Sequence, residues 1–519
     1  MGSGSKLTEM PTAVDERMEV SHSAHLTAKT ERCAVLIFLF FSFVYLLTSS
    51  GRVRTIDEYM AFFETESLVL RHSTAVPQAV QLNYYYGKYD IHGQPRAPYP
   101  PGHPLLATPW YLAGRFVLEP LARMPERARL MILEAAVCFS SAFFSAAIVV
   151  FLFLICHALG LSFHNSLYTA AIVGIATPVF AYSSWFFSEP LTTALMMAVA
   201  YFVFACHQGE AVPVGSAVIG GVLLGIAVFV RPAHVLVAAV FFAALLLRDG
   251  RRGLRPAFTL AIVSAIGLGV LLLYNFHLYG NALEFGYPAV AEGGKRLNSF
   301  ETPILTGLFG FLFSPGKSIF LFAPPMIVAL VGIPRLWKGD RGLATVAAAS
   351  LPVYLLFYAR YSQWEGGYCV GPRYLVPTLA LLCIAIAPMM SNLGKGARIA
   401  VISLTLVGFA VQVISIATSF MESQVPAGVY YGRNWNYQMS YSLWSQVRVL
   451  THHLGDRTPA RLGLGFDRWF VFLAKAGASH VFLGSMICFM LIGGMLSGIA
   501  LHRTLRQADE PLLSSGGSA

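Results

Sequence analysis

The chain alternates long apolar runs with polar connections. Each run is close to the roughly 20 residues that an α-helix needs to cross the hydrocarbon core of a bilayer. Twelve runs are visible, near 33–50, 130–157, 165–184, 190–206, 214–230, 233–247, 257–275, 318–334, 342–358, 371–389, 398–419 and 470–500. The pattern predicts an all-α polytopic membrane protein with about twelve transmembrane helices. Composition agrees, because 56% of the 519 residues are hydrophobic and only 12% are charged.

Short connections rich in Lys and Arg predict which side of the membrane is cytoplasmic. Four of them fall on one side if the N-terminus is cytoplasmic: 248–256, 335–342, 392–398 and 501–506. An even number of spans then places both termini in the cytoplasm. The first apolar run begins only at Cys33 and shows no cleavage pattern, so we expect it to be retained as a helix. We divide the chain into a disordered cytoplasmic N-terminus (1–32), a transmembrane domain (33–500) and a cytoplasmic tail (501–519).

The same orientation places the long connections on the outer face, at 51–129, 276–317, 359–370 and 420–469. The first is rich in Lys and Arg, which predicts either an outer vestibule that attracts an anionic head group or simply a solvated basic loop. Within it, prolines precede a stretch from about Leu105 to Val117 whose apolar residues recur at helical spacing. This predicts an interfacial helix. The last loop is rich in Tyr, Trp and Asn, which suits either interface anchoring or stacking on sugars.

The cysteines and the charged residues near span ends carry different information. Nearly all seven cysteines lie inside apolar runs, so we expect them to pack rather than to form disulfides. Acids at a membrane edge, in contrast, usually pair, ligate or catalyse. Candidates of this kind are Asp57 and Glu58 directly after the first span, Glu189 before Pro190, and the cluster Glu365, Arg373 and Tyr374. Lys317 lies in an apolar segment broken by Gly and Pro, a type of backbone tolerated at membrane depth only inside protein or beside a cavity.

Four of these motifs together resemble a known family. They are Asp57-Glu58 after the first span, "YPPGHPLL" (99–106), "SEPL" (188–191) and "GGYCVGPRYLVP" (366–377). They resemble the GT-C superfamily of polytopic membrane glycosyltransferases, in the branch of the protein O-mannosyltransferases and aminoarabinose transferases (glycosyltransferase family 39-like). The likeness extends over the whole chain in topology and rests on short motifs.

The resemblance implies an inverting transfer of a monosaccharide from a polyprenyl-phosphate donor, with Asp57 as the catalytic base. Many members carry a Lys-Pro-Pro motif, whereas this chain has Tyr99 before its two prolines. The candidate residues for binding the donor phosphate are Lys88, His103, Lys317 and Arg373. Glu58 has three open roles: to orient Asp57, to hold a cation, or to cap the helix that follows. We assign Glu189, Glu365 and Tyr374 to binding the acceptor or to orienting the reacting groups.

The sequence also leads to expectations about cofactors, partners, location and alternative functions. We expect no required cofactor, although a divalent cation held by Asp57 and Glu189 is conceivable. The expected partners are the polyprenyl-phosphate sugar, a lipid, glycan or protein acceptor, and membrane lipids, with no nucleic acid. The expected location is the bacterial inner membrane, with the active site on the outer face. The alternatives are a transporter or flippase of lipid-linked sugars, which would favour sites near the bilayer midplane, and a non-catalytic scaffold.

Overall fold

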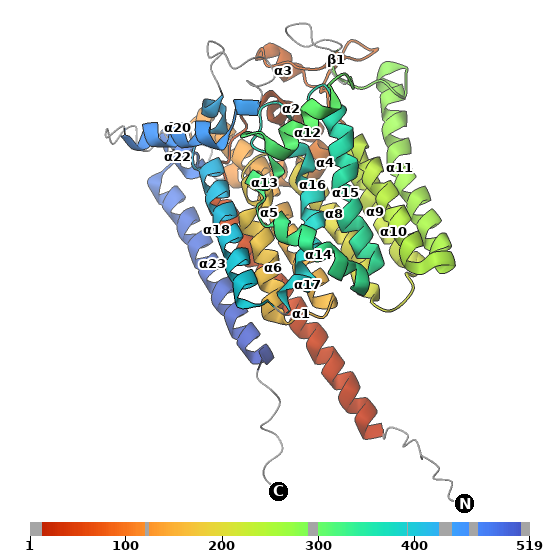
Figure 1. Ribbon diagram of the computed structural model, residues 1–519. Helices are drawn as coiled ribbons and strands as arrows, with labels where there is room; N and C mark the ends of the chain where they lie inside the picture. Colours follow the sequence, from red (N-terminus) through yellow and green to blue (C-terminus); the bar gives the residue numbers. More distant parts are fainter. Residues whose placement is uncertain are drawn as a thin grey trace, which may run out of the picture.

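The computed structural model describes residues 13–119, 124–288, 299–391, 393–424, 438–455 and 466–509. Most of its helices run side by side along one axis and form a bundle, as Figure 1 shows. The helices of this bundle are α1 (Ala13–Thr48), α5 (Glu126–Ala158), α6 (Phe163–Ala176), α8 (Glu189–Val199), α9 (Val214–Val230), α10 (Val235–Asp249), α11 (Leu254–Tyr279), α14 (Met326–Gly339), α15 (Arg341–Arg360), α16 (Val376–Leu382), α17 (Ala387–Met390), α18 (Lys395–Ala417) and α23 (His480–Asp509).

The remaining elements complete the bundle and cover one end of it. They are α2 (Ile56–Arg71), α3 (Pro77–Gln81), β1 (Lys88–Tyr89), β2 (Pro95–Arg96), α4 (Gly102–Leu118), α7 (Pro178–Tyr182), α12 (Ile304–Phe313), α13 (Ile319–Phe322), α20 (Leu443–Gly455) and α22 (Trp469–Lys475). The strands β1 and β2 pair antiparallel, with Lys88 opposite Arg96. Turns of 3-10 or π helix extend several helices, at Ala200–Phe204, Ala205–His207, Pro232–His234, Gly250–Gly253, Arg373–Leu375, Cys383–Ile386 and Phe420–Ser423.

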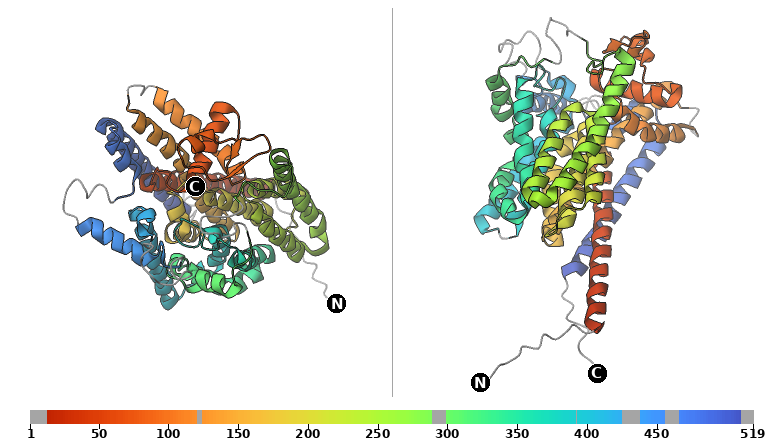
Figure 2. Two further views of the ribbon diagram at one scale, coloured as in Figure 1. Left: turned by 90° about the horizontal axis from the view of Figure 1, so that it is seen from above. Right: turned by 90° about the vertical axis from the view of Figure 1, so that its right-hand side faces the viewer.

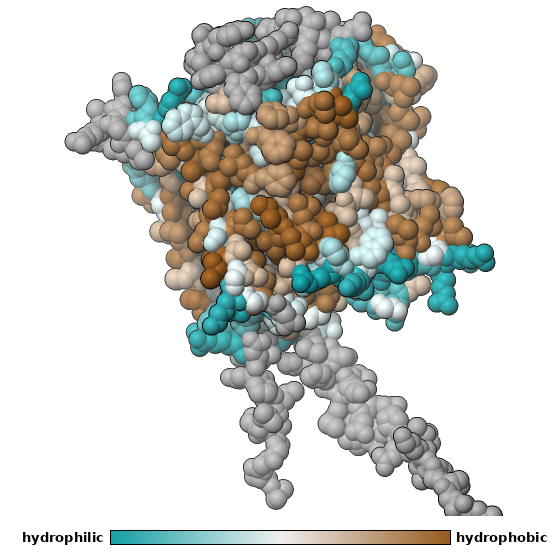
Figure 3. All heavy atoms as spheres, in the orientation of Figure 1, coloured by the Kyte–Doolittle hydropathy of each residue, from teal (hydrophilic) through white to brown (hydrophobic). Residues whose placement is uncertain are grey.

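The prediction of an all-helical polytopic membrane protein is confirmed. Among the described residues, eight helical stretches are long and apolar enough to cross a membrane, and one of these contains both α10 and α11. Two shorter helices, α9 and α12, are also apolar. Figure 3 shows the resulting surface on one side of the molecule: a broad apolar belt with hydrophilic residues at both ends. Such a belt is what a bilayer solvates, because lipid offers no hydrogen bonds to polar groups.

Each of the twelve predicted spans is helical, but several are divided. The span predicted at 318–334 consists of α13 and α14, separated at Pro324-Pro325, and the span predicted at 470–500 consists of α22 and α23. Proline lacks an N–H and clashes with the preceding turn, which explains the first division. α1 begins at Ala13 and thus extends N-terminal to the predicted span through a polar segment. Its Glu, Arg, Met and Lys residues are good helix formers that extend a helix already nucleated in the apolar run.

The first outer connection folds into helices that lie at one end of the bundle, opposite to the start of α1 and the end of α23 (Figures 1 and 2). The interfacial helix predicted from about Leu105 to Val117 is α4, which packs against α2 and α5. It leaves Leu105, Leu112 and Phe116 exposed, Phe116 by 76%. An exposed apolar face on a helix at the edge of the apolar belt suits burial in the bilayer interface.

A small apolar core holds α2 in place over the bundle. Its buried members include Met60, Phe62 and Phe63 of α2, together with Tyr111 of α4 and Phe186. Fully burying a side chain of this size contributes about 1.5–3 kcal/mol relative to exposing it. The core therefore fixes the first turn of α2, where Asp57 lies, relative to the chain around residue 186.

Two glycines allow backbones to approach where any side chain would collide. Gly51 takes the turn from α1 into the first outer connection at φ +58°, and a Cβ on it would lie 2.3 Å from Cβ of Trp469. Where α9 and α11 cross, a Cβ on Gly267 would lie 2.0 Å from the carbonyl oxygen of Gly225. The contact between these two helices thus depends on a position that has no side chain.

We predict that Gly267→Ala lowers the midpoint of thermal unfolding of the purified protein, because α9 and α11 must move apart. Overpacking of this kind costs about 1–3 kcal/mol. Gly269→Ala is the matched control, since a Cβ there has nothing within 4 Å. Equal midpoints for the two variants would show that the crossing tolerates a methyl group.

Candidate functional site

Hydrogen bonds join the chain after α1 to the chain before α8. Ser50 donates its N–H and its hydroxyl to the carbonyl oxygen of Ser184, at 3.2 and 2.8 Å. The N–H of Phe186 donates to Oε1 of Glu58 at 3.0 Å. These contacts bring the first turn of α2 next to the first turn of α8, although the two lie about 130 residues apart in the sequence.

Glu58 closes the N-terminus of α2. Thr55 is the N-cap: its hydroxyl accepts from the Glu58 N–H at 3.2 Å, and Oε2 of Glu58 accepts from the Thr55 N–H at 3.0 Å. This reciprocal arrangement is a capping box, which satisfies N–H groups that the helix itself leaves free. Oε2 also accepts from the N–H of Arg54 at 3.1 Å. The side chain is buried, and burial raises the pKa of Glu58.

Both oxygens of Glu58 are therefore occupied by backbone donors. Of the three roles left open for this residue, the geometry fits the helix cap and the orientation of its neighbour. A cation would have to compete with those backbone N–H groups for the same two oxygens. The position of Glu58 also fixes the backbone of Asp57. The side chain of Asp57 does not join the cap and contacts Tyr99 and Arg373 instead.

Asp57 lies between a phenol and a guanidinium. The hydroxyl of Tyr99 donates to Oδ1, and Nη1 of Arg373 donates to Oδ2 at 2.6 Å. Hydrogen bonds in which both partners carry charge are roughly twice as strong as neutral ones. The Asp57 side chain nonetheless stays 28% exposed. Each carboxylate oxygen of Asp57 thus accepts one hydrogen bond, and part of the side chain remains accessible to solvent.

Glu189 is the buried counterpart of Asp57. Its Oε1 accepts from Nε of Arg373 at 2.9 Å and forms an ion pair with Nη2 of Arg231 at 2.8 Å. Its side chain is 1% exposed. Its other oxygen, Oε2, has no hydrogen-bond partner among the residues that the structure describes. Glu189 thus orients two arginines and retains one free acceptor.

The four charges form a balanced network in which two carboxylates face two guanidiniums. A buried ion pair is tolerated only where its charges are paired and hydrogen-bonded. Arg373 is 7% exposed and lies between the two acids, whereas Arg231 is 20% exposed. The more accessible members of the network are therefore Asp57 and Arg231, whereas Arg373 and Glu189 are buried.

Aromatic rings surround both arginines. The guanidinium of Arg373 lies 4.1 Å from the ring centre of Phe187, and that of Arg231 lies 5.3 Å from the ring centre of Tyr374. Tyr374 in turn stacks on Tyr358, with ring centres 4.4 Å apart. Cation–π contacts favour a charge whose water has been removed. The rings fix the planes of both guanidiniums, so their remaining N–H groups point in set directions.

His103 lies close to the network without carrying a charge. It is buried at the start of α4, with its ring 4.4 Å from that of Phe186. Burial lowers the pKa of His103 to about 4. At neutral pH its imidazole is uncharged, so toward a phosphate it can act only as a hydrogen-bond donor.

Both lysines predicted to bind the donor phosphate have partners outside the Asp57 network. Lys88 is exposed and forms an ion pair with Glu284. Lys317 is buried, and its Nζ donates to the Cys369 carbonyl oxygen at 2.8 Å and contacts Sγ of Cys369 at 3.2 Å. It therefore braces the loop before Arg373 and does not contact Asp57. Glu365 is buried in the same loop.

The position where a divalent cation would bridge Asp57 and Glu189 is taken by the guanidinium of Arg373, which donates to both. A hard divalent ion prefers six or more oxygen ligands. Among the described residues no group of three or more His, Cys, Asp or Glu side chains is placed to hold a metal ion. A bridging cation would have to displace Arg373.

Two members of the network were not singled out from the sequence. Arg231 lies in the short turn between two apolar runs, and the signal for it was an arginine on the outer side, against the positive-inside rule. Tyr99 was noted only as a departure from a Lys-Pro-Pro motif, yet its hydroxyl holds Asp57. All seven cysteines are free, as expected.

Comparisons with known proteins give a distant structural likeness. No protein-family model matches the chain, and no curated protein matches it. The crystal structure of ArnT from Cupriavidus metallidurans bound to undecaprenyl phosphate is 17% identical, covers 92% of this chain and 77% of its own, and has a TM-score of 0.43. The apo structure of the same protein is 15% identical, with coverages of 94% and 78% and a TM-score of 0.43. At this identity and TM-score the likeness by itself carries no conclusion about function.

Proposed function

We propose that this chain is a GT-C-type inverting glycosyltransferase. It would move a monosaccharide from a polyprenyl-phosphate donor to an acceptor hydroxyl on the outer face of the membrane. One observation carries the proposal: Asp57 is a partly exposed carboxylate held between Tyr99 and Arg373, beside a second arginine that shares Glu189. A base and fixed positive charge are the two components that displacement of a phosphate-linked sugar requires.

In this reaction Asp57 takes the proton of the acceptor hydroxyl as its oxygen attacks the anomeric carbon. The bond from that carbon to the phosphate oxygen breaks, and its electrons leave with the polyprenyl phosphate. One base and no covalent intermediate give inversion at the anomeric carbon. Tyr99 and Arg373 hold the carboxylate in a single orientation, which a positioned proton transfer needs.

Arg231 and Arg373 would stabilise the leaving phosphate. Guanidiniums match phosphate oxygens in a two-pronged geometry. Arg231 is the more exposed of the two, and its plane is set by Glu189 and Tyr374. The free Oε2 of Glu189 could accept a hydroxyl of the donor or acceptor sugar. His103 would supply a neutral N–H nearby, and Lys88, Lys317 and Glu365 would act outside the reacting centre.

The position of the charges favours an enzyme over a transporter or flippase. Asp57 lies in the first turn of α2, Glu189 begins α8, Arg231 follows the last residue of α9, and Arg373 precedes α16. All four thus lie at the ends of helices on one side of the apolar belt. A transporter site is expected near the bilayer midplane instead.

We place the protein in the bacterial inner membrane with both termini in the cytoplasm. The start of α1 and the end of α23 both lie at the end of the bundle opposite to the first outer connection (Figure 1). The proposed acceptors remain a lipid, a glycan or a protein.

We predict that the purified protein consumes at least one donor from a panel of polyprenyl-phosphate sugars, measured as loss of the lipid-linked sugar. Asp57→Asn should bind that donor but transfer it on the order of 10²-fold or more slowly, because it removes the base and keeps the shape. No turnover of any donor by the wild type would contradict the proposed function.

The neighbouring acid is the control for this assignment. Glu58→Gln disturbs a helix cap, so its main effect should be a lower unfolding midpoint, of the size of a lost cap at about 1 kcal/mol. If Asp57→Asn transfers at the wild-type rate while Glu58→Gln folds normally and does not, then Glu58 is the base.

We further predict that Arg373→Lys weakens donor binding and also destabilises the protein. A lysine cannot bridge Asp57 and Glu189 with two parallel donors, and breaking a buried ion pair typically costs about 3–5 kcal/mol. Donor affinity and thermal unfolding measured on the same preparation separate the two effects. Arg360→Lys is a matched control, since Arg360 is exposed and donates to a carbonyl oxygen. Unchanged affinity in folded Arg373→Lys protein would make Arg373 purely structural.

Chelation should leave most of the transfer activity, because Arg373 already occupies the place between the two acids. Turnover is compared with and without a chelator after extensive dialysis. Complete loss that returns on adding a divalent cation would contradict this assignment.

A further inference from the structure

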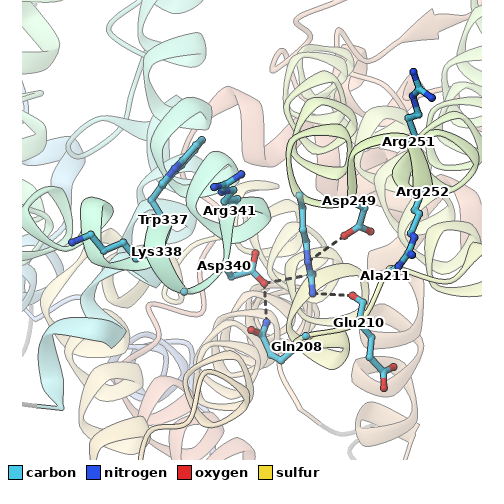
Figure 4. Close-up of a pocket in the computed structure, with 13 residues that line it drawn as sticks. Gln208, Glu210, Ala211, Asp249, Arg251, Arg252, Trp337, Lys338, Asp340 and Arg341 are labelled. Carbon is cyan, nitrogen blue, oxygen red and sulfur yellow. Dashed lines mark hydrogen bonds and ion pairs between the residues drawn. The ribbon is translucent and has the colours of Figure 1, made fainter.

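A second concave site lies at the opposite end of the bundle. It is a cavity of about 700 Å³ whose lining residues come from three connections, 208–211, 248–252 and 337–341. The first follows α8, the second joins α10 to α11, and the third joins α14 to α15. Figure 4 shows the charged side chains that these segments direct around it.

This cavity is separate from the Asp57 network. α8 and its continuation run from Glu189 at one end to His207 at the other, 18 residues later. At about 1.5 Å per residue this is roughly 27 Å. α10 likewise begins near Arg231 and ends at Asp249. The two sites share helices but no residue.

Two of the three acids of the cavity wall, Asp249 and Asp340, already have partners. Nε of Arg248 lies 3.7 Å from Asp249, and its Nη1 lies 3.5 Å from Asp340. Asp340 also accepts from the side chain of Gln208 at 2.9 Å and, as N-cap of α15, from the Leu343 N–H at 2.8 Å. The Val212 N–H donates to Asp249 at 2.9 Å. These contacts build a fixed polar floor and leave little carboxylate charge for other cations.

Three of the four arginines that line the cavity, Arg251, Arg252 and Arg341, lack such partners among the described residues. Arg252 and Arg341 are exposed, and no ion pair or hydrogen bond from either side chain is found within the described ranges. In Figure 4 they lie on either side of Asp249 and Asp340, whereas Lys338 and Arg251 point outward. The lining holds five Lys or Arg residues against three Asp or Glu, a formal excess of two positive charges.

We propose that this cavity binds a phosphate-bearing group through Arg252 and Arg341. An excess of cations at the cytoplasmic ends of helices is common, but here the cations border a concave floor in which Asp249 and Asp340 are already paired. Arginine is suited to phosphate because its planar fork donates two hydrogen bonds at once. Trp337 lines the same cavity and is 41% exposed, and tryptophan favours the depth of lipid head groups. The group is the head group of an anionic lipid or a free phosphate.

The test is native mass spectrometry of the full-length protein in detergent, titrated in separate arms with phosphatidylglycerol and with inorganic phosphate. The pocket variant is Arg252→Gln/Arg341→Gln. The matched control is Arg398→Gln/Arg503→Gln, which removes two exposed arginines that do not line the cavity. Thermal unfolding of each variant checks its fold.

We expect the pocket variant to bind phosphatidylglycerol on the order of 10- to 30-fold more weakly, following the attraction of basic residues to anionic lipid. The control should bind as the wild type does, and Arg252→Lys/Arg341→Lys should recover part of the affinity. The same pattern with inorganic phosphate alone would identify a soluble ligand of the same chemistry. If wild type and pocket variant bind both probes equally, the proposal is wrong.

Discussion

The guanidinium of Arg373 is the contact on which the candidate site depends. It donates to Asp57 from the first outer connection and to Glu189 from the start of α8, two acids that are 132 residues apart in the sequence. Without it, Asp57 would keep Tyr99 and Glu189 would keep Arg231, but the two acids would no longer share a partner, and hydrogen bonds such as those of Ser50 and Glu58 with the backbone would be left to join these segments. Charges can leave water only as a paired set. The network therefore joins the first outer connection to the start of α8, beside the small apolar core beneath α2.

Much of the fold was predictable because bilayer thickness imposes a length on apolar runs. The run 214–230 and helix α9 have the same bounds. What could not be predicted was where a run divides, since the breaks at Pro178 and Pro324-Pro325 leave hydrophobicity unchanged. α12 was missed because it has only 10 residues, too few to register as a span. α1 extends N-terminal to the apolar run through polar residues, and polarity does not exclude helix when a helix already exists to extend.

The site was predictable only in part. The sequence shows which charged residues adjoin apolar runs, but it does not show which of them pair with one another. Asp57, Glu189 and Arg373 stood out because each charge adjoins an apolar run, and the structure brings these three together. Lys88 and Lys317 have the same kind of sequence context, yet one pairs with a surface acid and the other with a backbone carbonyl. No local pattern tells which cation meets which acid. Glu58 is the exception, because Thr55 three residues before it is the sequence signature of a capping box.

In the proposed reaction the balance of the network also explains why one arginine serves both base and leaving group. Before transfer, two carboxylates face two guanidiniums, and Arg373 is shared between Asp57 and Glu189. When Asp57 accepts the acceptor's proton, it loses its negative charge at the moment the departing phosphate gains one. The total charge of protein and substrates stays constant, and the positive charge of Arg373 is released from Asp57 toward the phosphate. Arg231 keeps Glu189 neutralised meanwhile. A buried second acid is therefore needed, because it holds both arginines in place while the first acid changes its charge.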